Sequence, residues 1–350
     1  MPTIITLLTL GFVIFIHELG HLFAAKRARV GVSEFAVGMG PKIASFMWGN
    51  TLYSLRILPF GGFVKVKGMN DDDCPIEEDY RQKSALQRAS ILGAGSFMNI
   101  ILGLVTYIAI AYFVGQPVVS NTIQAVVDGS PAQTAGIQVS DQLIAINNQP
   151  VEDVHTDAIQ VIRDSEGAPI TLTINRNQSP LNMTVSAQKG APDQPYQLGI
   201  SFETQIIKHG FFESISVGFS KTVSTISQSF LSIKMLVTGQ AGVSDLAGPV
   251  GLVQLASSQI QNSMVAFLGL MALISISLGI INLFPFPVLD GGHLMFLLIE
   301  VLRGKPLNKN VETILNNMAA VCLIGLMAFV VFNDVISWND RVDLIKEMVQ

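Results

Sequence analysis

Two histidines and a glutamate lie at metal-binding spacing near the start of the chain. Residues 12–25 read FVIFIHELGHLFAA, in which His17, Glu18 and His21 form the pattern H-E-x-x-H. On a helix, residues at i and i+4 share one face, so both imidazoles can reach a single metal ion, most often Zn2+. Glu18 is then the candidate general base. The pattern predicts a site that hydrolyses a bond with the help of a metal.

The surroundings of this motif are apolar. No side chain from Met1 to Ile16 carries a charge, and the next charged residue after Glu18 is Lys26. Ionisable side chains are costly in hydrocarbon and are rarely kept there without a role, so the motif indicates a functional site inside a membrane. The alternative is a chance pentapeptide whose histidines are satisfied by polar packing between helices.

A second polar cluster lies near residue 290. Residues 246–289 carry no charge, and residues 281–293 read INLFPFPVLDGGH. A carboxylate at the end of an apolar span needs a partner, and a metal held by two histidines would supply one, so Asp290 is a candidate third ligand. By chemistry alone His293 is also a candidate. The prolines and glycines break the helix, which is tolerated at membrane depth only where protein covers the backbone or a polar cavity adjoins it.

The composition is that of a membrane protein. Hydrophobic residues make up 49% of the chain and charged residues 13%, against about 25% charged residues in a soluble domain. Four charge-poor stretches, residues 4–25, 90–115, 263–285 and 314–333, are each close to the roughly 20 residues that cross a bilayer core. The net charge of −5 offers no basic surface for nucleic acid, and no such partner is expected. We predict a multi-pass α-helical membrane protein with about four transmembrane helices.

The basic residues predict the orientation of these helices. Ten Lys or Arg residues lie between the first two stretches, and Arg303, Lys305 and Lys309 follow the third. The positive-inside rule makes both loops cytoplasmic, which places the termini and residues 116–262 on the outer side of the cytoplasmic (inner) membrane. His21 lies four residues before the end of the first apolar run, about 6 Å along a helix. The site is therefore expected within the membrane near its cytoplasmic face.

The chain divides into four regions: a first membrane half (1–115), a small α+β domain (116–205), a surface helix with a linker (206–262) and a second membrane half (263–350). Residues 50–68 alternate apolar and polar side chains on either side of the sequence PFGG, which predicts a β-hairpin. Its edge could accept an extended peptide, although an ordinary loop hairpin is the simpler alternative. Residues 211–237 place apolar side chains at spacings of three and four, which predicts an amphipathic helix on the outer membrane surface or above the site.

The region 116–205 resembles a known peptide-binding domain. The sequence DGSPAQTAGIQVSDQLIAINNQPV (128–151) closely resembles a PDZ domain of the bacterial, permuted type, and one copy is present. The sequence YQLGI (196–200) resembles the carboxylate-binding loop of that family, in which backbone N–H groups hold a peptide C-terminus. The resemblance implies one PDZ-like domain with a peptide C-terminus as its partner.

Three motifs in order carry a wider resemblance. HELGH in the first span, the PDZ-like insert and NLFPFPVLDGG at the end of the third span together look like the site-2 protease family of intramembrane zinc metalloproteases, in particular its bacterial RseP-like members. The resemblance covers nearly the whole chain. It implies that His17, His21 and Asp290 bind one Zn2+ and that Glu18 is the catalytic acid/base.

Two asparagines match further parts of the family pattern. Asn282 stands at the asparagine of the family motif N-x-x-P-x-P-x-L-D-G, so the resemblance implies that it positions substrate near the scissile bond. Asn99 ends GAGSFMN (93–99), which matches the family's Gly-rich motif in the second span except for the usual proline, and is a second substrate-positioning candidate. The resemblance also implies that the hairpin at 50–68 is associated with the membrane and clamps substrate.

The expected activity is hydrolysis of peptide bonds within or next to transmembrane segments, with single-span membrane proteins or peptides in the lipid bilayer as substrates. By resemblance, an anti-sigma factor already trimmed by another protease and leftover signal peptides are candidates. Two other classes stay open: a catalytically silent membrane scaffold that recruits partners through its PDZ-like domain, and a zinc-transporting membrane protein. A transporter should show ligands along a continuous path, whereas the predicted spans contain one compact set.

Overall fold

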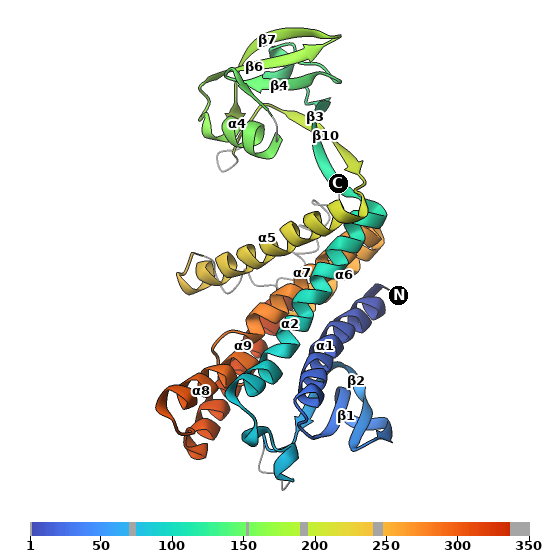
Figure 1. Ribbon diagram of the computed structural model, residues 1–350. Coiled ribbons are helices and arrows are strands. Elements are labelled where there is room, and N and C mark those ends of the chain that lie inside the picture. The colour runs from blue at the N-terminus through green and yellow to red at the C-terminus, as the bar shows by residue number, and fades with distance from the viewer. Residues whose placement is uncertain (1, 70–74, 152–153, 190–194, 241–247, 337–350) are drawn as a thin grey trace. The chain divides into compact units, whose positions relative to one another are not determined.

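The computed structural model describes residues 2–69, 75–151, 154–189, 195–240 and 248–336 (Figure 1). The chain forms two compact units, of which the second is Val114–His209 and the first comprises the segments Met1–Phe113 and Gly210–Gln350. The second unit is therefore an insertion between the two halves of the first.

The first unit is built mainly from helices. They are α1 (Pro2–Arg27), α2 (Ala85–Ala109, continued by the π-helical turn η3, Ile110–Val114), α5 (Phe211–Val237), α6 (Pro249–Asn262), α7 (Met264–Asn282), α8 (Asp290–Arg303) and α9 (Lys309–Ile336). Among the described residues, four helical segments are long and apolar enough to cross a membrane: Thr3–Arg27, Ala85–Val114, Met264–Asn282 and Lys309–Asp334. These are the four spans that the sequence predicts, so the chain is an integral membrane protein.

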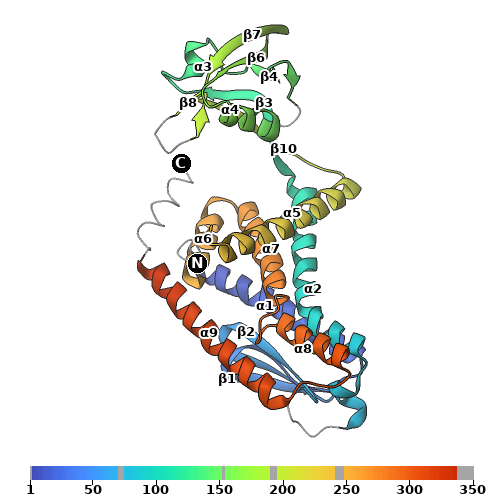
Figure 2. The ribbon, with the colours of Figure 1, turned by 90° about the vertical axis from the view of Figure 1, so that its left-hand side faces the viewer.

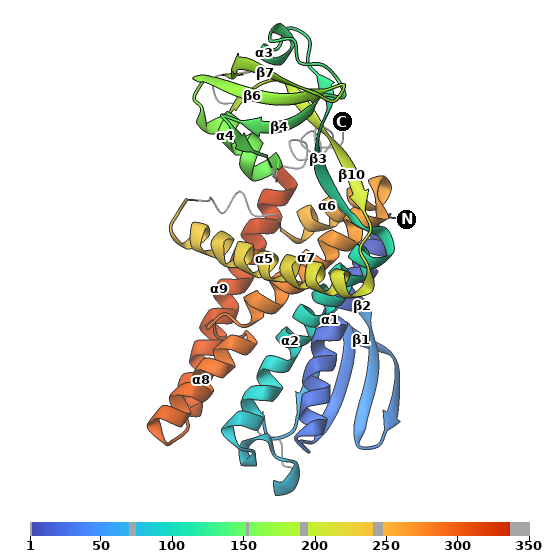
Figure 3. The ribbon, with the colours of Figure 1, turned by 45° about the horizontal axis from the view of Figure 1, so that its top comes forward.

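The helix α2 is central to this unit. It begins with a capping box in which Ser84 and Gln87 each satisfy a backbone N–H of the other, and it packs against α1, α5, α7 and α8. Figures 1 and 3 show α1 and α2 side by side. At Gly20 of α1 an added Cβ would lie 2.5 Å from the carbonyl oxygen of Ala94, so the two backbones approach as closely as small residues allow in membrane helices.

The predicted amphipathic helix is α5, which lies across α2 and α7 (Figure 2). Its Ile226 and Ile233 pack on a buried cluster that consists of Tyr107, Ala272, Ile276 and Ile280. The hydroxyl groups of Tyr107 and Thr225 lie 3.2 Å apart, which adds a polar contact between α2 and α5. Although α5 is 27 residues long, it is not among the four described segments that are both long and apolar enough to cross a membrane.

A β-sheet beside α1 differs from the predicted hairpin. It consists of β1 (Val32–Trp48) and β2 (Thr51–Val66), whose turn lies at residues 49–50 and not within PFGG. The two halves of β2 do not pair with each other, because β1 lies between them: Phe35 is paired with both Tyr53 and Val64. The sequence analysis missed β1, since its Gly38, Gly40 and Pro41 interrupt the strand pattern. Two short 3-10 turns, Ile76–Glu78 and Tyr80–Gln82, then lead to α2.

The second unit has α+β architecture. Its elements are β3 (Gln116–Val126), α3 (Pro131–Thr134), β4 (Gln142–Ile146), β5 (Gln149–Pro150), the π-helical turn η4 (Val154–Ile159), α4 (Gln160–Asp164), β6 (Pro169–Arg176), β7 (Ser179–Ser186), β8 (Gln188–Lys189), β9 (Tyr196–Gln197) and β10 (Ile200–Ile207). The main sheet has the strand order β10-β3-β4-β6-β7, with β5 paired to β4. Its core is apolar and includes Ile123, Leu143, Leu172, Ile174 and Leu198, each at most 2% exposed.

Candidate metal centre

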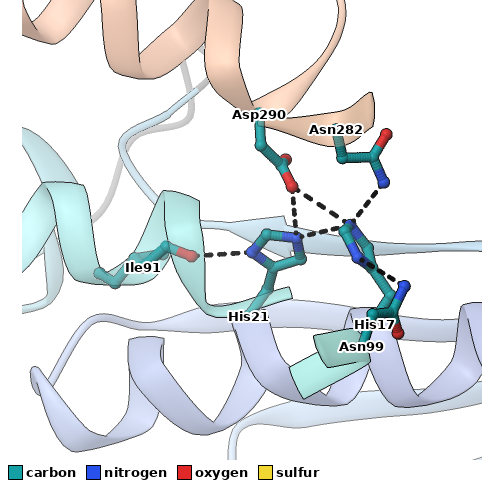
Figure 4. A network of polar contacts seen from close by, with 6 residues as sticks. All are labelled: His17, His21, Ile91, Asn99, Asn282 and Asp290. Carbon is teal, nitrogen blue, oxygen red and sulfur yellow. Dashed lines mark hydrogen bonds and ion pairs between the residues drawn. The ribbon is translucent and has the colours of Figure 1, made fainter. Parts of the chain in front are cut away.

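Three side chains from two helices meet at one point (Figure 4). His17 and His21 come from α1, and Asp290 is the first residue of α8. The Nε2 atoms of the histidines lie 3.2 Å apart, and Oδ2 of Asp290 lies 3.2 Å from Nε2 of His17 and 3.3 Å from Nε2 of His21. In the part of the chain that the structure describes, this is the one group of three or more His, Cys, Asp or Glu side chains whose geometry could hold a metal ion.

The donor atoms fit a zinc ion. Bonds of about 2.0–2.1 Å in a tetrahedron put neighbouring ligand atoms about 3.3 Å apart, which matches the three observed separations. Oδ2 of Asp290 is buried without a hydrogen-bond partner among the described residues, and a cation would compensate for its burial. Two imidazoles and one carboxylate are also a known donor set of catalytic zinc sites, which leave one position open for water or substrate.

The segment before α8 directs Asp290 toward the histidines. Residues 283–289 turn back after α7, and α8 begins at Asp290. Gly291 and Gly292 permit this turn, because an added Cβ at these positions would lie 2.2 Å and 2.3 Å from carbonyl oxygens of the preceding segment. Val288 has a φ of 82°, a left-handed conformation that a β-branched residue rarely adopts. Backbone strain of this kind is typical of functional sites.

Glu18 adjoins both the candidate metal ligands and the β-sheet. It is half-buried and follows His17 directly in α1. An added Cβ at Gly62 would lie 3.0 Å from Cγ of Glu18, so the backbone of β2 passes directly beside this side chain. A substrate backbone that reached Glu18 would therefore also meet β2.

The two asparagines that the sequence predicts as substrate-positioning residues both contact His17. Nδ2 of Asn282 lies 3.3 Å from Nε2 of His17, and Nδ2 of Asn99 lies 3.4 Å from Nδ1 of the same ring. Asn282 is half-buried, whereas Asn99 is 0% exposed. Asn99 therefore has no accessible surface in this structure, and its predicted role toward a substrate stays a prediction.

His293 does not join the cluster. Its Nδ1 lies 3.8 Å from Oε1 of Glu312 in α9, and its ring stands edge-on to that of Phe296. Of the two residues that chemistry alone left open as a third ligand, the structure places Asp290 and not His293 beside the histidines.

The sequence analysis named Asn99 of α2 as a site candidate but missed the contributions of Ile91 and Gly95. The carbonyl oxygen of Ile91 lies 2.8 Å from Nδ1 of His21. At Gly95 an added Cβ would lie 2.3 Å from Nε2 of His21 and 2.8 Å from Nε2 of His17, so only glycine leaves room for the two imidazoles. The available signal was the i, i+4, i+8 spacing of Ile91, Gly95 and Asn99, which puts all three on one helix face.

A bundle of membrane-length helices with an H-E-x-x-H pair and a converging aspartate defines an intramembrane metalloprotease. The comparisons with known proteins agree. The model of Peptidase family M50 matches residues 5–326, and the chain belongs to this family. Membership confirms the predicted resemblance to the site-2 protease family, and the chain is an intramembrane zinc metalloprotease.

Three relatives align along nearly the whole chain. A protein of Clostridium perfringens is 36% identical over 338 residues, which are 96% of this chain and 99% of the relative. The zinc metalloprotease RasP of Bacillus licheniformis is 29% identical over 424 residues (97% and 99%). The regulator of sigma-W protease RasP of Bacillus subtilis is 26% identical over 410 residues (94% and 96%). This family membership favours a protease over the silent scaffold and the zinc transporter.

Proposed function

We propose that His17, His21 and Asp290 hold one Zn2+ and that Glu18 is the catalytic acid/base of peptide hydrolysis. The observation that carries this assignment is the triangle of donor atoms with sides of 3.2, 3.2 and 3.3 Å. When bound there, zinc supplies Lewis-acid chemistry, which activates water and polarises the scissile carbonyl group. Glu18 then has two tasks: it accepts a proton from the attacking water and returns it to the nitrogen of the leaving amine.

The substrate must be extended where it is cut. A transmembrane helix engages its carbonyl groups in hydrogen bonds between residues i and i+4, so several of these bonds must break before a peptide bond can reach Glu18. Residues 62–66 of β2 pair on one side with β1, and the described part of this sheet contains only β1 and β2. The other edge of this segment, next to Glu18, is suited to replace the lost bonds by strand addition. Asn282, half-buried beside His17, positions the substrate near the scissile bond.

The exposed surface of the sheet fits the same role. Phe46, Met47 and Trp48 at its turn are each more than 60% exposed, which is favourable in lipid and unfavourable in water. We assign this β-element to the membrane, as the sequence predicts. Its aromatic and apolar turn would hold it at the bilayer while the opposite end of β2 holds the substrate.

The substrates in this proposal are single-span membrane proteins or the membrane-embedded peptides that remain of them. The name of the Bacillus subtilis relative refers to regulation of sigma-W, which favours an anti-sigma factor; remnant signal peptides are the second candidate class. The protein would act in the cytoplasmic (inner) membrane, with its termini and the unit Val114–His209 outside and the metal centre near the cytoplasmic face. The distribution of Lys and Arg along the sequence supports this orientation.

The unit Val114–His209 serves in this proposal as a PDZ-like domain that takes a peptide C-terminus. Its β10 begins at Ile200, the last residue of the segment YQLGI, and lies at one end of the strand order. An edge strand that follows a carboxylate-binding loop is the arrangement by which such domains add a peptide as a further strand. Gly199, which has a φ of 75°, supplies the left-handed turn between the loop and the strand.

Substitution of Glu18 tests the assignment. The Glu18→Gln protein is expected to keep stoichiometric zinc and to lose cleavage of a single-span reporter, because glutamine cannot carry the proton. His17→Ala and Asp290→Ala are expected to lose the zinc itself. Zinc content and cleavage are measured on purified full-length protein in lipid. Cleavage by Glu18→Gln at the parent rate would overturn the role of Glu18, and zinc retained by His17→Ala would overturn the ligand set.

A further inference from the structure

One face of α2 contacts both imidazoles, at their Nδ1 atoms and beside their Nε2 atoms. Ile91, Gly95 and Asn99 are spaced by four residues along this helix, so they lie on one face. Ile91 and Asn99 each contact an Nδ1 atom, one on His21 and one on His17. Between them, Gly95 leaves room for the Nε2 atoms.

The contact with Ile91 fixes the tautomer of His21. A backbone carbonyl oxygen can only accept a hydrogen bond, so Nδ1 of His21 carries the proton and donates over 2.8 Å. Nε2 of the neutral ring then keeps its lone pair, and this lone pair faces Asp290. A histidine ligand of a metal commonly needs this kind of partner on its other nitrogen.

The contact with Asn99 leaves two possibilities for His17. With Nδ2 of Asn99 toward Nδ1, that ring nitrogen accepts, the proton of the neutral ring sits on Nε2, and Nε2 cannot bind a metal. In this orientation Oδ1 of Asn99 is also buried without a hydrogen-bond partner among the described residues, which is unfavourable for a buried acceptor. A half-turn of the amide about the Cβ–Cγ bond exchanges the two atoms, and Oδ1 then accepts from Nδ1 of His17.

We propose that Asn99 is a positioning residue of the metal centre, whose Oδ1 accepts a hydrogen bond from Nδ1–H of His17. This bond keeps the proton of the neutral ring on Nδ1 and leaves the Nε2 lone pair for the metal. This inference rests on the proposed role of His17 as a ligand. Asn99 is completely buried, and a buried side chain can position His17 without contacting the substrate. It also gives α2 the same task at both histidines: a backbone oxygen serves His21 and a side-chain oxygen serves His17.

Two substitutions at position 99 separate the role of Asn99 as a hydrogen-bond acceptor from its role in packing. Asn99→Asp keeps the size and an oxygen that can accept a hydrogen bond from Nδ1, whereas Asn99→Leu keeps the branched shape and the number of heavy atoms and removes the acceptor. The matched control is Ser96→Ala, because Ser96 lies one turn earlier on α2, is also 0% exposed, and its Oγ has no hydrogen-bond partner among the described residues. All three are made in the Glu18→Gln protein, which removes proteolysis from the measurement.

The readouts are the rate at which a chelator removes zinc from the full-length protein in lipid and the 15N shifts of the His17 ring. Asn99→Leu is expected to weaken zinc retention by about 10- to 100-fold and to shift the tautomer, while Asn99→Asp and Ser96→Ala stay within a few-fold of the parent. Equal loss in Asn99→Asp and Asn99→Leu would show a packing role. Unchanged retention in Asn99→Leu would also overturn the inference, whereas a parent protein that binds no zinc would overturn the proposed function itself.

Discussion

Adding a single methyl group at Gly95 tests whether zinc binding needs the space between α2 and the two histidines of α1. In Gly95→Ala the new Cβ would lie 2.3 Å from Nε2 of His21 and 2.8 Å from both Nε2 and Cε1 of His17. Unbonded carbon and nitrogen atoms need about 3.5 Å, so at least one imidazole must move by about 1 Å. Metal ligands tolerate displacements of only about 0.2 Å.

Two effects of opposite sign compete in this variant. Replacing glycine with alanine inside a helix favours the helix by about 1 kcal/mol in aqueous peptides, so α2 itself should form at least as well as before. The displaced imidazole should weaken zinc binding by more than the roughly 10- to 100-fold loss typical of a removed hydrogen-bond partner of a ligand. We therefore expect a folded protein that retains little zinc and does not cleave.

The matched control is Gly93→Ala, two residues earlier on α2. An added Cβ at Gly93 meets no heavy atom within 4 Å, so this variant receives the same helix preference without the clash. Both proteins are purified at full length, and zinc content, thermal unfolding and cleavage of a single-span reporter are measured in the same lipid. Stoichiometric zinc together with parental cleavage in Gly95→Ala would refute the placement of α2 behind the metal ligands.

Two further predictions concern buried carboxylates away from the metal centre. Asp334 of α9 accepts hydrogen bonds from two backbone N–H groups at the start of α6. Asp334→Ala should lower the free energy of unfolding by about 1–3 kcal/mol for each group left unpaired, and Asp334→Asn should lower it less. An unchanged midpoint of thermal unfolding in Asp334→Ala would contradict this prediction. In the second unit, burial would raise the pKa of Asp141, but hydrogen bonds from Arg176 and the Gln138 backbone and the charge of Arg176 outweigh this and lower it. The stabilisation is therefore complete above about pH 4 and is lost as the pH falls through the lowered pKa. Amide exchange in β4 and β6 of the full chain, corrected for intrinsic rates, should accelerate below pH 4 in the parent and not in Asp141→Asn.

Local sequence was sufficient to predict the four membrane spans and two of the three candidate metal ligands, His17 and His21. The spacing of His17 and His21 puts both imidazoles on one face wherever that helix lies, and the apolar runs mark the four membrane-length helices before any packing is known. These features depend on the period of the helix and on the thickness of the bilayer, and both are readable from neighbouring residues.

The third candidate ligand and the surroundings of the site depended on contacts between distant segments. Asp290 and His293 are three residues apart, and both are chemically suitable as a third ligand. The turn that Gly291 and Gly292 permit brings the carboxylate of Asp290, and not the ring of His293, to the histidines. The burial of Asn99 and the position of β1 between the halves of β2 were equally hidden. The spacing of residues along the sequence determines which helix face a side chain lies on. Which atom it contacts on a neighbouring element depends on how closely the two backbones pack.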